Sequence, residues 1–363
     1  MEYSQHHHNS TRHFANANGL SLCFESFGNS RDPSVILIMG LGAQMTVWPT
    51  PLCKAIARQG FYVIRFDNRD IGLSSKLHHL RPPAWHKVVA TGFLRTPLNT
   101  PYSLNDMVMD TIGLLDALQI EAAHVVGSSM GGMIAQLTAI HFPDRVRSLS
   151  AIMTSSGAKG LPRGNLGLLW QLCRPRPKGE NSEAALNRLV SLCQKIGSSE
   201  FMDDENYLRE RLRSDIQRCY DPAGVGRQTA AVVTAPPRKK LLRQINTPTL
   251  VIHGTSDPIL PYQHGIDLAQ SIPNAYLELV QGMGHYLPLS LVARLAELLI
   301  THMKSAENPF RKSVLRPTIP VPTTSQDKRI VHFPAKPNFD PLASASICSS
   351  HKPTKPLNPP FLV

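Results

Sequence analysis

The 363-residue chain has no long apolar run, few aromatic side chains and few cysteines. No stretch reaches about 18 consecutive apolar residues, so the sequence predicts no membrane-spanning helix. Residues 1–18 are polar, rich in His and Asn, and lack the apolar segment of a secretory signal. We therefore expect a cytoplasmic protein whose N-terminus is flexible over residues 1–18.

The six cysteines show none of the short paired spacings that indicate a zinc site or a disulfide framework. We interpret them as reduced thiols, most of them packing residues. His6, His7 and His8 stand in the polar N-terminal segment, where a solvated tail is the better interpretation than a metal site. The sequence therefore predicts no metal and no cofactor.

Acidic residues are scarce relative to basic ones, with 26 Asp and Glu against 38 Lys and Arg and a net charge of +12. Such a balance can indicate a nucleic-acid partner, but +5 of the excess lies in residues 305–363, which also hold eleven of the thirty prolines. This segment has no period of 2 or 3.6, which predicts a disordered tail. We expect no nucleic-acid partner, and docking of the tail on a partner or an anionic surface stays an open alternative.

Hydrophobic residues make up 42% of the chain, enough for one large core with an insertion. Continuous apolar runs and alternating segments predict strands, and amphipathic segments between them predict helices. Ser103 and Asp106 resemble a capping box at the start of one helix. The predicted strands are residues 20–27, 35–39, 61–66, 122–126, 148–153, 249–253 and 275–280, and the predicted helices are residues 52–59, 103–118, 132–140 and 288–303. This alternation predicts an α/β fold with a mostly parallel, doubly wound sheet.

The alternation of strands and helices stops between residues 155 and 243. Helical periodicity appears around residues 184–196 and 206–216, and proline-rich stretches interrupt it. Since the strand pattern resumes directly afterwards, we predict a helical cap over residues 155–243, inserted between core segments 19–154 and 244–304. An independent domain is the alternative.

Gly127-Ser128-Ser129-Met130-Gly131 stands between a predicted buried strand and a predicted helix. A sharp strand-turn-helix junction of this kind presents its central residue in a strained conformation, and it needs glycines two residues before and two residues after. Ser129 meets that requirement, whereas Ser128 has Val126 where a glycine is needed. Ser129 is therefore the predicted nucleophile.

A serine nucleophile needs a histidine base and a carboxylate that orients the imidazole, and both follow the serine at this type of junction. Asp257 comes just after the strand at 249–253, and His285 lies in the Gln281-Gly282-Met283-Gly284-His285 loop after the strand at 275–280. Sites in open α/β sheets lie at these carboxyl ends of strands. We predict Asp257 and His285 as the partners of Ser129.

Other acids and histidines fit the triad less well. Asp67 and Asp70 precede the serine, Asp267 falls in a helical stretch and is interpreted as solvated surface, and His124 and His253 lie inside strands and are interpreted as structural. These residues are set aside.

Acyl transfer also needs N–H donors for the oxyanion that develops on the carbonyl oxygen. Met130, the residue after the nucleophile, is predicted to supply one backbone N–H. Leu41, in the Gly40-Leu41-Gly42-Ala43 loop after the strand at 35–39, is predicted to supply the second. The alternative for this loop is a glycine turn without a catalytic part.

Two further segments carry a family resemblance. Phe66-Asp67-Asn68-Arg69-Asp70-Ile71-Gly72-Leu73-Ser74 resembles an Asp-x-Arg-x-x-Gly-x-Ser segment, and Phe142-Pro143-Asp144-Arg145-Val146 resembles the segment that closes the helix after the nucleophile. With the serine motif, they make residues 20–303 similar to a serine hydrolase of the alpha/beta-hydrolase family, most of all to aclacinomycin methylesterase-like members. The resemblance implies a carboxylic ester hydrolase that acts on a small-molecule ester.

Relatives with an aspartate nucleophile are set aside by Ser129. Carbon-carbon bond hydrolases of ring-fission products commonly have tryptophan after the catalytic histidine, where this chain has Tyr286. This activity and that of cofactor-free haloperoxidase-like perhydrolases stay open as alternatives. Trp170 and residues 166–169 are candidates for the pocket lining, while the sequence leaves the substrate and the oligomeric state undetermined.

Overall fold

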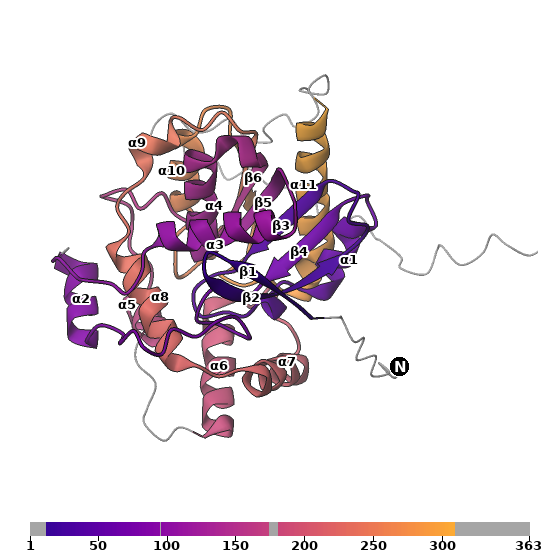
Figure 1. Ribbon diagram of the computed structural model, residues 1–363. Helices are drawn as coiled ribbons and strands as arrows, with labels where there is room; N and C mark the ends of the chain where they lie inside the picture. The colour runs from indigo at the N-terminus through magenta and orange to yellow at the C-terminus, as the bar shows by residue number, and fades with distance from the viewer. Residues whose placement is uncertain (1–11, 95, 174–180, 309–363) are drawn as a thin grey trace, which may run out of the picture. The chain divides into compact units, whose positions relative to one another are not determined.

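The computed structural model describes residues 12–94, 96–173 and 181–308. Within these residues, an eight-stranded sheet has the order β1-β2-β4-β3-β5-β6-β7-β8 (Figure 1). The pairs β1–β2 and β2–β4 are antiparallel and the other neighbouring strands are parallel. The prediction of a mostly parallel α/β sheet is therefore confirmed. The strands are β1 (His13–Ala17), β2 (Leu20–Phe27), β3 (Ser34–Ile38), β4 (Tyr62–Phe66), β5 (Ala123–Ser128), β6 (Val146–Ile152), β7 (Thr249–Gly254) and β8 (Tyr276–Val280).

The expectation of a flexible segment over residues 1–18 is wrong for residues 13–17, which form strand β1. Asn18 and Gly19 have φ values of 49° and 74°, and the register pairs Ala17 with Leu20 across them. An Asn-Gly pair with two positive φ angles is the favoured connection of a tight β-hairpin. Residues 1–11, the rest of the predicted flexible segment, lie outside the described residues.

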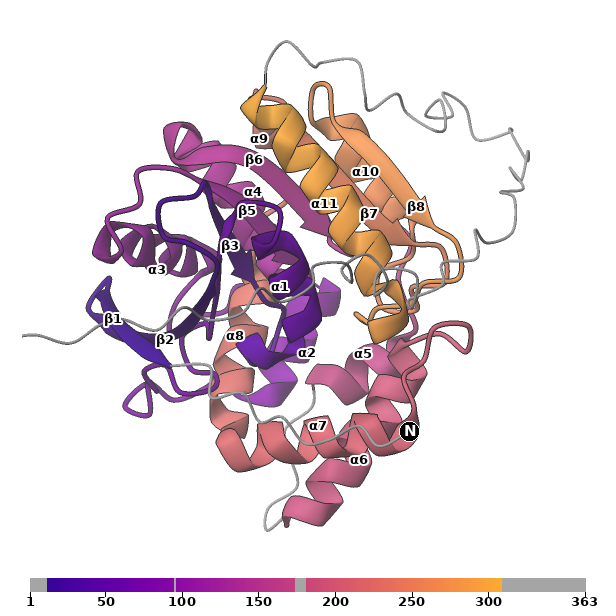
Figure 2. The same ribbon diagram turned by 90° about the vertical axis from the view of Figure 1, so that its right-hand side faces the viewer.

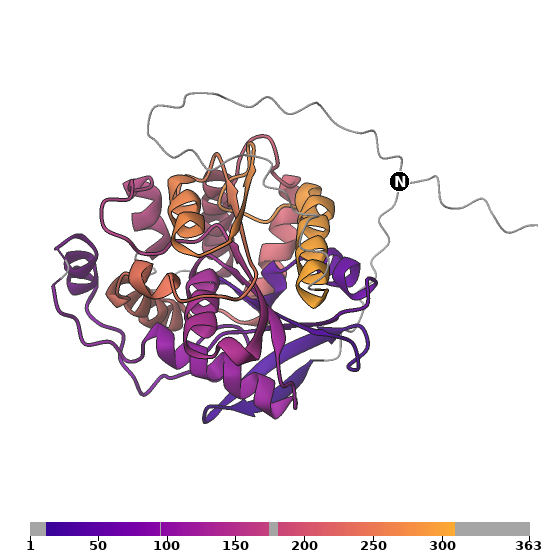
Figure 3. The ribbon, with the colours of Figure 1, turned by 90° about the horizontal axis from the view of Figure 1, so that it is seen from above.

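Helices cover both faces of the sheet (Figures 2 and 3). On one face, α3 and α4 bury apolar side chains such as Met107, Leu115 and Ile134 against the strands. On the other face, α1 and α11 do the same with Leu52, Ile56 and Leu299. Burial on both faces explains why the central strands are continuous apolar runs. These helices are α1 (Thr50–Ala57), α3 (Leu104–Ala117), α4 (Met130–His141) and α11 (Val292–Glu307).

Two helix ends show how local sequence sets the boundaries. Ser103 caps α3, because its hydroxyl accepts from the N–H of Asp106 while the Asp106 carboxylate accepts from the N–H of Ser103. The last helix differs from its predicted span of 288–303. A 3-10 turn, η3 (Leu289–Leu291), precedes it, and α11 continues to Glu307, which pairs with Arg147 at 3.0 Å. Residues 309–363 of the predicted tail lie outside the described residues.

Five helices lie between β6 and β7 in the described chain: α5 (Leu166–Cys173), α6 (Ser182–Ile196), α7 (Glu205–Arg218), α8 (Pro222–Thr234) and α9 (Lys239–Leu242). In Figures 1 and 2, α6 and α7 lie next to each other below the sheet. Helix α8 was absent from the sequence-based expectation, although Asp221 as N-cap and Pro222 at the first helical position are both start signals. We refer to α5–α9 as the cap helices. Helix α2 (Trp85–Leu94) lies between β4 and α3 in the chain.

Buried ion pairs join the cap helices to the loop after β4. The guanidinium of Arg227 on α8 donates to both oxygens of Asp70 at 2.7 and 2.8 Å, and Tyr102 donates to the same carboxylate. Arg218 at the end of α7 lies 2.7 Å from Asp67. Loss of one partner from a buried pair costs about 3–5 kcal/mol, so these contacts hold α7 and α8 firmly against the core.

Candidate active site

Ser129 stands at the turn between β5 and α4 with φ 54° and ψ −117°. A non-glycine residue in this region is strained, and such strain is tolerated where the surrounding structure enforces it. Here α4 packs so closely against β5 and β3 that positions 127 and 131 have no room for a side chain. A Cβ at Gly127 would lie 2.2 Å from the carbonyl oxygen of Gly131, and one at Gly131 would lie 2.1 Å from that of Ile38. The two glycines therefore permit the turn that exposes the Ser129 hydroxyl.

His285 connects Ser129 to Asp257. Its Nε2 lies 3.0 Å from the Ser129 Oγ, and its Nδ1 lies 2.7 Å from the Asp257 Oδ2. The second oxygen of Asp257 accepts from the backbone N–H groups of Ile259 and Leu260, each at 2.8 Å. These two bonds fix the carboxylate, which then directs the imidazole toward the serine. The structure thus brings the three predicted residues into one hydrogen-bonded chain.

A second histidine approaches the same carboxylate. The Nε2 of His253, the last but one residue of β7, donates to the carbonyl oxygen of Leu260 at 2.8 Å and lies 3.4 Å from the Asp257 Oδ2. Burial alone would raise the pKa of Asp257, but His285 and His253 outweigh burial and hold this pKa well below its usual range. Asp257 is therefore an anion at neutral pH. Sequence reasoning had set His253 aside as structural, and no sequence signal marks its contact with Asp257.

The two predicted oxyanion donors belong to segments that adjoin Ser129. Met130 is the first residue of α4, where backbone N–H groups have no partner inside the helix. The loop that holds Leu41 passes close to the serine, since a Cβ at Gly40 would lie 3.2 Å from the Ser129 Cβ. Within the described residues, the N–H groups of Leu41 and Met130 have no hydrogen-bond acceptor. Both are available to a bound carbonyl oxygen.

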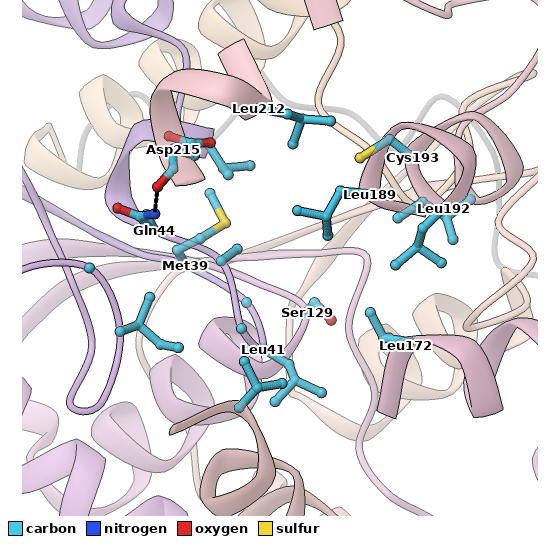
Figure 4. Close-up of a pocket in the computed structure, with 18 of the residues that line it drawn as sticks. Met39, Leu41, Gln44, Ser129, Leu172, Leu189, Leu192, Cys193, Leu212 and Asp215 are labelled. Carbon is cyan, nitrogen blue, oxygen red and sulfur yellow. Dashed lines mark hydrogen bonds between the residues drawn. The ribbon is translucent and has the colours of Figure 1, made fainter. Parts of the chain in front are cut away.

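A cavity of about 220 Å³ opens over Ser129 and His285. Figure 4 shows Leu189 and Leu192 of α6 and Leu212 of α7 on the side opposite Ser129 and Leu41. The expectation that Trp170 lines the pocket is wrong: its side chain is 50% exposed, and α5 contributes Leu172 instead. Residues 166–169 are likewise absent from the lining. The apolar wall is therefore shared between the cap helices and core residues such as Met39, Leu41 and Leu287.

The cavity also has polar lining residues, among them Arg211 and Asp215 of α7. The guanidinium of Arg211 lies over the Tyr286 ring, 5.2 Å from its centre, and its buried Nε has no hydrogen-bond partner in the described chain. Asp215 accepts from the Thr46 hydroxyl at 2.6 Å, and burial raises the pKa of its carboxyl. The arginines of the described residues whose side chains are buried all have acceptors: Arg65 with Glu25, Arg69 with Asp110, Arg218 with Asp67, Arg227 with Asp70, and Arg238 with the Ser155 carbonyl.

The acids that were set aside have other partners. The prediction that Asp267 is solvated is wrong, since this residue is buried. Its carboxylate accepts from Ser156 at 2.5 Å and pairs with Lys239. Asp67 and Asp70 bind cap arginines. Across the three described ranges of the chain, no group of three His, Cys, Asp or Glu side chains is placed to hold a metal ion. The same ranges include no helix long and apolar enough to cross a bilayer.

Comparison with known proteins shows the family of this chain and several relatives. The family described as "alpha/beta hydrolase fold" matches residues 33–290. Rhodomycin D methylesterase DauP of Streptomyces sp. (strain C5) is 29% identical over 308 residues, which are 79% of this chain and 96% of that protein. The 2-hydroxymuconate semialdehyde hydrolase of Pseudomonas sp. (strain CF600) is 30% identical over 226 residues, 60% of this chain and 74% of that protein.

Solved structures show the same architecture. The enol-lactonase from Burkholderia xenovorans LB400 superposes with a TM-score of 0.62 at 21% identity, covering 80% of this chain and all of that one. A meta-cleavage product hydrolase from Pseudomonas fluorescens IP01 gives a TM-score of 0.61, also at 21% identity, with 81% of this chain and 98% of that one covered. At this level of identity, the likeness concerns the fold alone.

Proposed function

This chain belongs to the alpha/beta-hydrolase family, and from that premise we propose that it is a serine carboxylic ester hydrolase that works through an acyl-enzyme. The observation that carries the proposal is the hydrogen-bonded chain from Ser129 through His285 to Asp257, with distances of 3.0 and 2.7 Å. A nucleophile, a base and an orienting acid at such distances are what acyl transfer by serine requires.

In the first half of the reaction, Ser129 attacks the ester carbonyl. The His285 Nε2 takes the hydroxyl proton as the new carbon–oxygen bond forms, and Asp257 stabilises the resulting imidazolium. The carbonyl oxygen becomes an oxyanion that accepts hydrogen bonds from the N–H groups of Leu41 and Met130. Loss of one such donor typically slows catalysis by roughly 10²–10³, so this pair supplies a large share of the rate. The oxyanion then collapses and the bond between the carbonyl carbon and the alcohol oxygen breaks, while His285 gives its proton to the departing alcohol.

In the second half, water takes the place of the alcohol. His285 removes a proton from the water, whose oxygen attacks the acyl-enzyme carbonyl, and the same two N–H groups bind the second oxyanion. Collapse of this intermediate breaks the bond to Ser129, which recovers its proton from His285. The products are an alcohol and a carboxylic acid, and the enzyme returns to its starting state.

The cavity supports a small to medium ester as substrate. Its volume is about 220 Å³, and its walls are largely aliphatic side chains contributed by both the cap helices and the core. Two relatives at 29% and 28% identity are named rhodomycin D methylesterases. We extend that reaction type to this chain as cleavage of a methyl or similarly short alcohol from a larger, mainly apolar carboxylic acid.

A second candidate is carbon-carbon bond hydrolysis of a ring-fission product, and one observation favours it. Arg211 lines the cavity without an ion-pair partner among the described residues, and a guanidinium of this kind suits a substrate that carries a carboxylate or an enolate. Parallel assays of an aryl ester and a vinylogous diketone acid separate the two activities. Turnover of the diketone at a rate well above that of the ester would replace the esterase proposal.

Substitution of Ser129 by alanine tests the proposal. Ser129→Ala is expected to lose nearly all hydrolysis of short aryl esters, by about 10⁵-fold or more, while the thermal unfolding temperature changes little. Ser150→Ala is a matched control, because Ser150 is a buried serine on β6 whose hydroxyl has no partner among the described residues. Undiminished turnover in Ser129→Ala would disprove the assignment.

A further inference from the structure

The loop that carries the candidate oxyanion donor Leu41 is held by a glutamine from the cap helices. The backbone N–H of Gly42 donates to the Oε1 of Gln228 on α8 at 2.9 Å. The Nε2 of the same amide donates to the carbonyl oxygen of Arg69 at 2.9 Å, and the side chain is fully buried. Gln228 thus ties the residue next to Leu41 to a second fixed point in the core.

Gln44, which directly follows the loop that holds Leu41, binds the end of α7. The Nε2 of Gln44 donates to the carbonyl oxygens of Asp215 and Cys219 at the end of α7, at 2.5 and 3.0 Å (Figure 4 shows the bond to Asp215). Its Oε1 accepts from Arg218 at 2.5 Å. The Asp215 carbonyl also accepts from the N–H of Cys219 at 3.0 Å, and Cys219 is the residue that follows α7, so Gln44 binds the C-terminal end of α7. We call Gln44 and Gln228 the glutamine clamp.

The loop has little freedom between the nucleophile and the cap. Gly40 lies against Ser129, and Gly42 lies against Val225 of α8, whose Cγ1 would be 3.2 Å from a Cβ at Gly42. Gly42 has φ 68°, a conformation that a residue with a side chain adopts only with strain. The backbone around Leu41 is therefore held by contacts with α8 in addition to its own turn, in which the N–H of Ala43 donates to the Gly40 carbonyl at 3.4 Å.

We propose that the glutamine clamp positions the N–H of Leu41 in the oxyanion hole, which makes the cap helices part of the catalytic apparatus as well as the pocket wall. This inference rests on the proposed esterase function. An oxyanion donor must stand about 2.7–3.1 Å from the developing charge. Without the Gln228 amide, the half-buried N–H of Gly42 loses its acceptor. A shift of the loop toward another acceptor then displaces the adjoining Gly40–Leu41 peptide, which carries the Leu41 N–H.

The loop that carries His285 also contacts a cap helix. The backbone N–H of His285 donates to the carbonyl oxygen of Ile196, the last residue of α6, at 2.7 Å. Gly284 packs so closely against Gly197 that a Cβ there would lie 2.6 Å from its carbonyl carbon. Cap residues therefore contact the backbone of both the oxyanion loop and the histidine loop.

The test compares Gln228→Met with Thr229→Val in the full chain. Methionine keeps the length of glutamine and removes its acceptor and donors. Thr229 is an equally buried neighbour on α8 whose hydroxyl bonds only within its own helix, to the Val225 carbonyl, so Thr229→Val controls for loss of a buried polar group. Gln228→Met is expected to lower kcat for an aryl ester about 10- to 100-fold, less than full removal of an oxyanion donor. KM is expected to change less than about threefold.

Two further measurements show whether Gln228 positions the Leu41 N–H or only stabilises the fold. A serine-directed phosphonate, whose attack by Ser129 also develops an oxyanion, should label Gln228→Met more slowly by the same factor as kcat. Thr229→Val should stay within about twofold of the unsubstituted enzyme in both assays. A kcat of Gln228→Met within about twofold of that enzyme, or a loss that lies wholly in KM, would overturn the proposal.

Gln44→Met removes the other half of the clamp and carries the same expectation if Gln228→Met does not fold. Ser129→Ala distinguishes failure of the esterase proposal from failure of the positioning role. If Ser129→Ala keeps its activity, the esterase proposal itself fails. If Ser129→Ala is inactive while both glutamine variants turn over normally, only the positioning role is refuted.

Discussion

Replacement of Asp257 by asparagine tests how His285 becomes a base. The asparagine oxygen can take the place of Oδ1 and keep both bonds from the N–H groups of Ile259 and Leu260. Its NH₂ group then takes the place of Oδ2, 2.7 Å from the His285 Nδ1. Because that NH₂ donates to Nδ1, the imidazole must carry its proton on Nε2, which faces Ser129. The serine then has no base.

The size of the effect follows from this change of tautomer. In a Ser-His-Asp triad the same substitution lowers kcat about 10⁴-fold, which corresponds to about 5 kcal/mol of activation free energy at roughly 1.4 kcal/mol for each factor of ten. The fold should survive, since the hydrogen bonds that anchor the side chain to the backbone are retained. We therefore expect a large loss in kcat with a small change in KM and in thermal stability.

The assay is steady-state hydrolysis of an aryl acetate, with the unfolding temperature measured on the same samples. Asp267→Asn is the matched control, because Asp267 is also a buried carboxylate and its partners, Ser156 and Lys239, lie outside the triad. This control should keep its activity. A folded Asp257→Asn enzyme that retains more than about a tenth of the original kcat would refute the reasoning.

Arg211→Met should lower kcat/KM for an aryl ester ending in a carboxylate by about 10- to 100-fold, since a hydrogen bond to a charged group contributes about 1.5–3 kcal/mol. The kcat/KM for an uncharged ester of equal length should change less than about threefold. Equal losses on both esters would contradict a role for Arg211 in binding an anion. Burial lowers the pKa of His302 to about 4, whereas the unfolded chain takes up this proton near pH 6.5. The lowered pKa of His302 contributes to the free energy of unfolding above about pH 6.5, and this contribution is lost as the pH falls toward 4, by about 2 kcal/mol between about pH 7 and pH 5. Urea unfolding at these two pH values should show that His302→Gln lacks this loss, and an unchanged pH dependence in the variant would contradict it.

Features encoded by neighbouring residues could be predicted from the sequence. Strand β2 has the predicted bounds, and β7 differs by one residue, because a buried strand leaves a continuous or alternating apolar pattern. The capping box at Ser103 was likewise visible. The predictions of an alpha/beta-hydrolase fold, a hydrolase and a likeness to methylesterases are confirmed by the family match and by the named relatives. The roles of Ser129, His285, Asp257, Leu41 and Met130 stay predictions.

Features that depend on contacts between distant residues could not be predicted. Gly42 and Gln228 are 186 residues apart in the chain, and nothing in either segment indicates their hydrogen bond. The pocket lining depends on how α5 is rotated, which places Leu172 toward the cavity and leaves Trp170 half exposed. Strand β1 was missed for another reason: its Asn18-Gly19 hairpin signal is local, but it lies in a polar segment that was interpreted as a tail.

The most direct test of the central claim is to trap the acyl-enzyme. An aryl ester is mixed with the full chain, the reaction is stopped with acid during turnover, and mass spectrometry determines the intact mass and the labelled peptide. We expect one added acyl group, located on Ser129 and absent from Ser129→Ala. An acyl group on another residue, or normal turnover by Ser129→Ala without any covalent adduct, would contradict it.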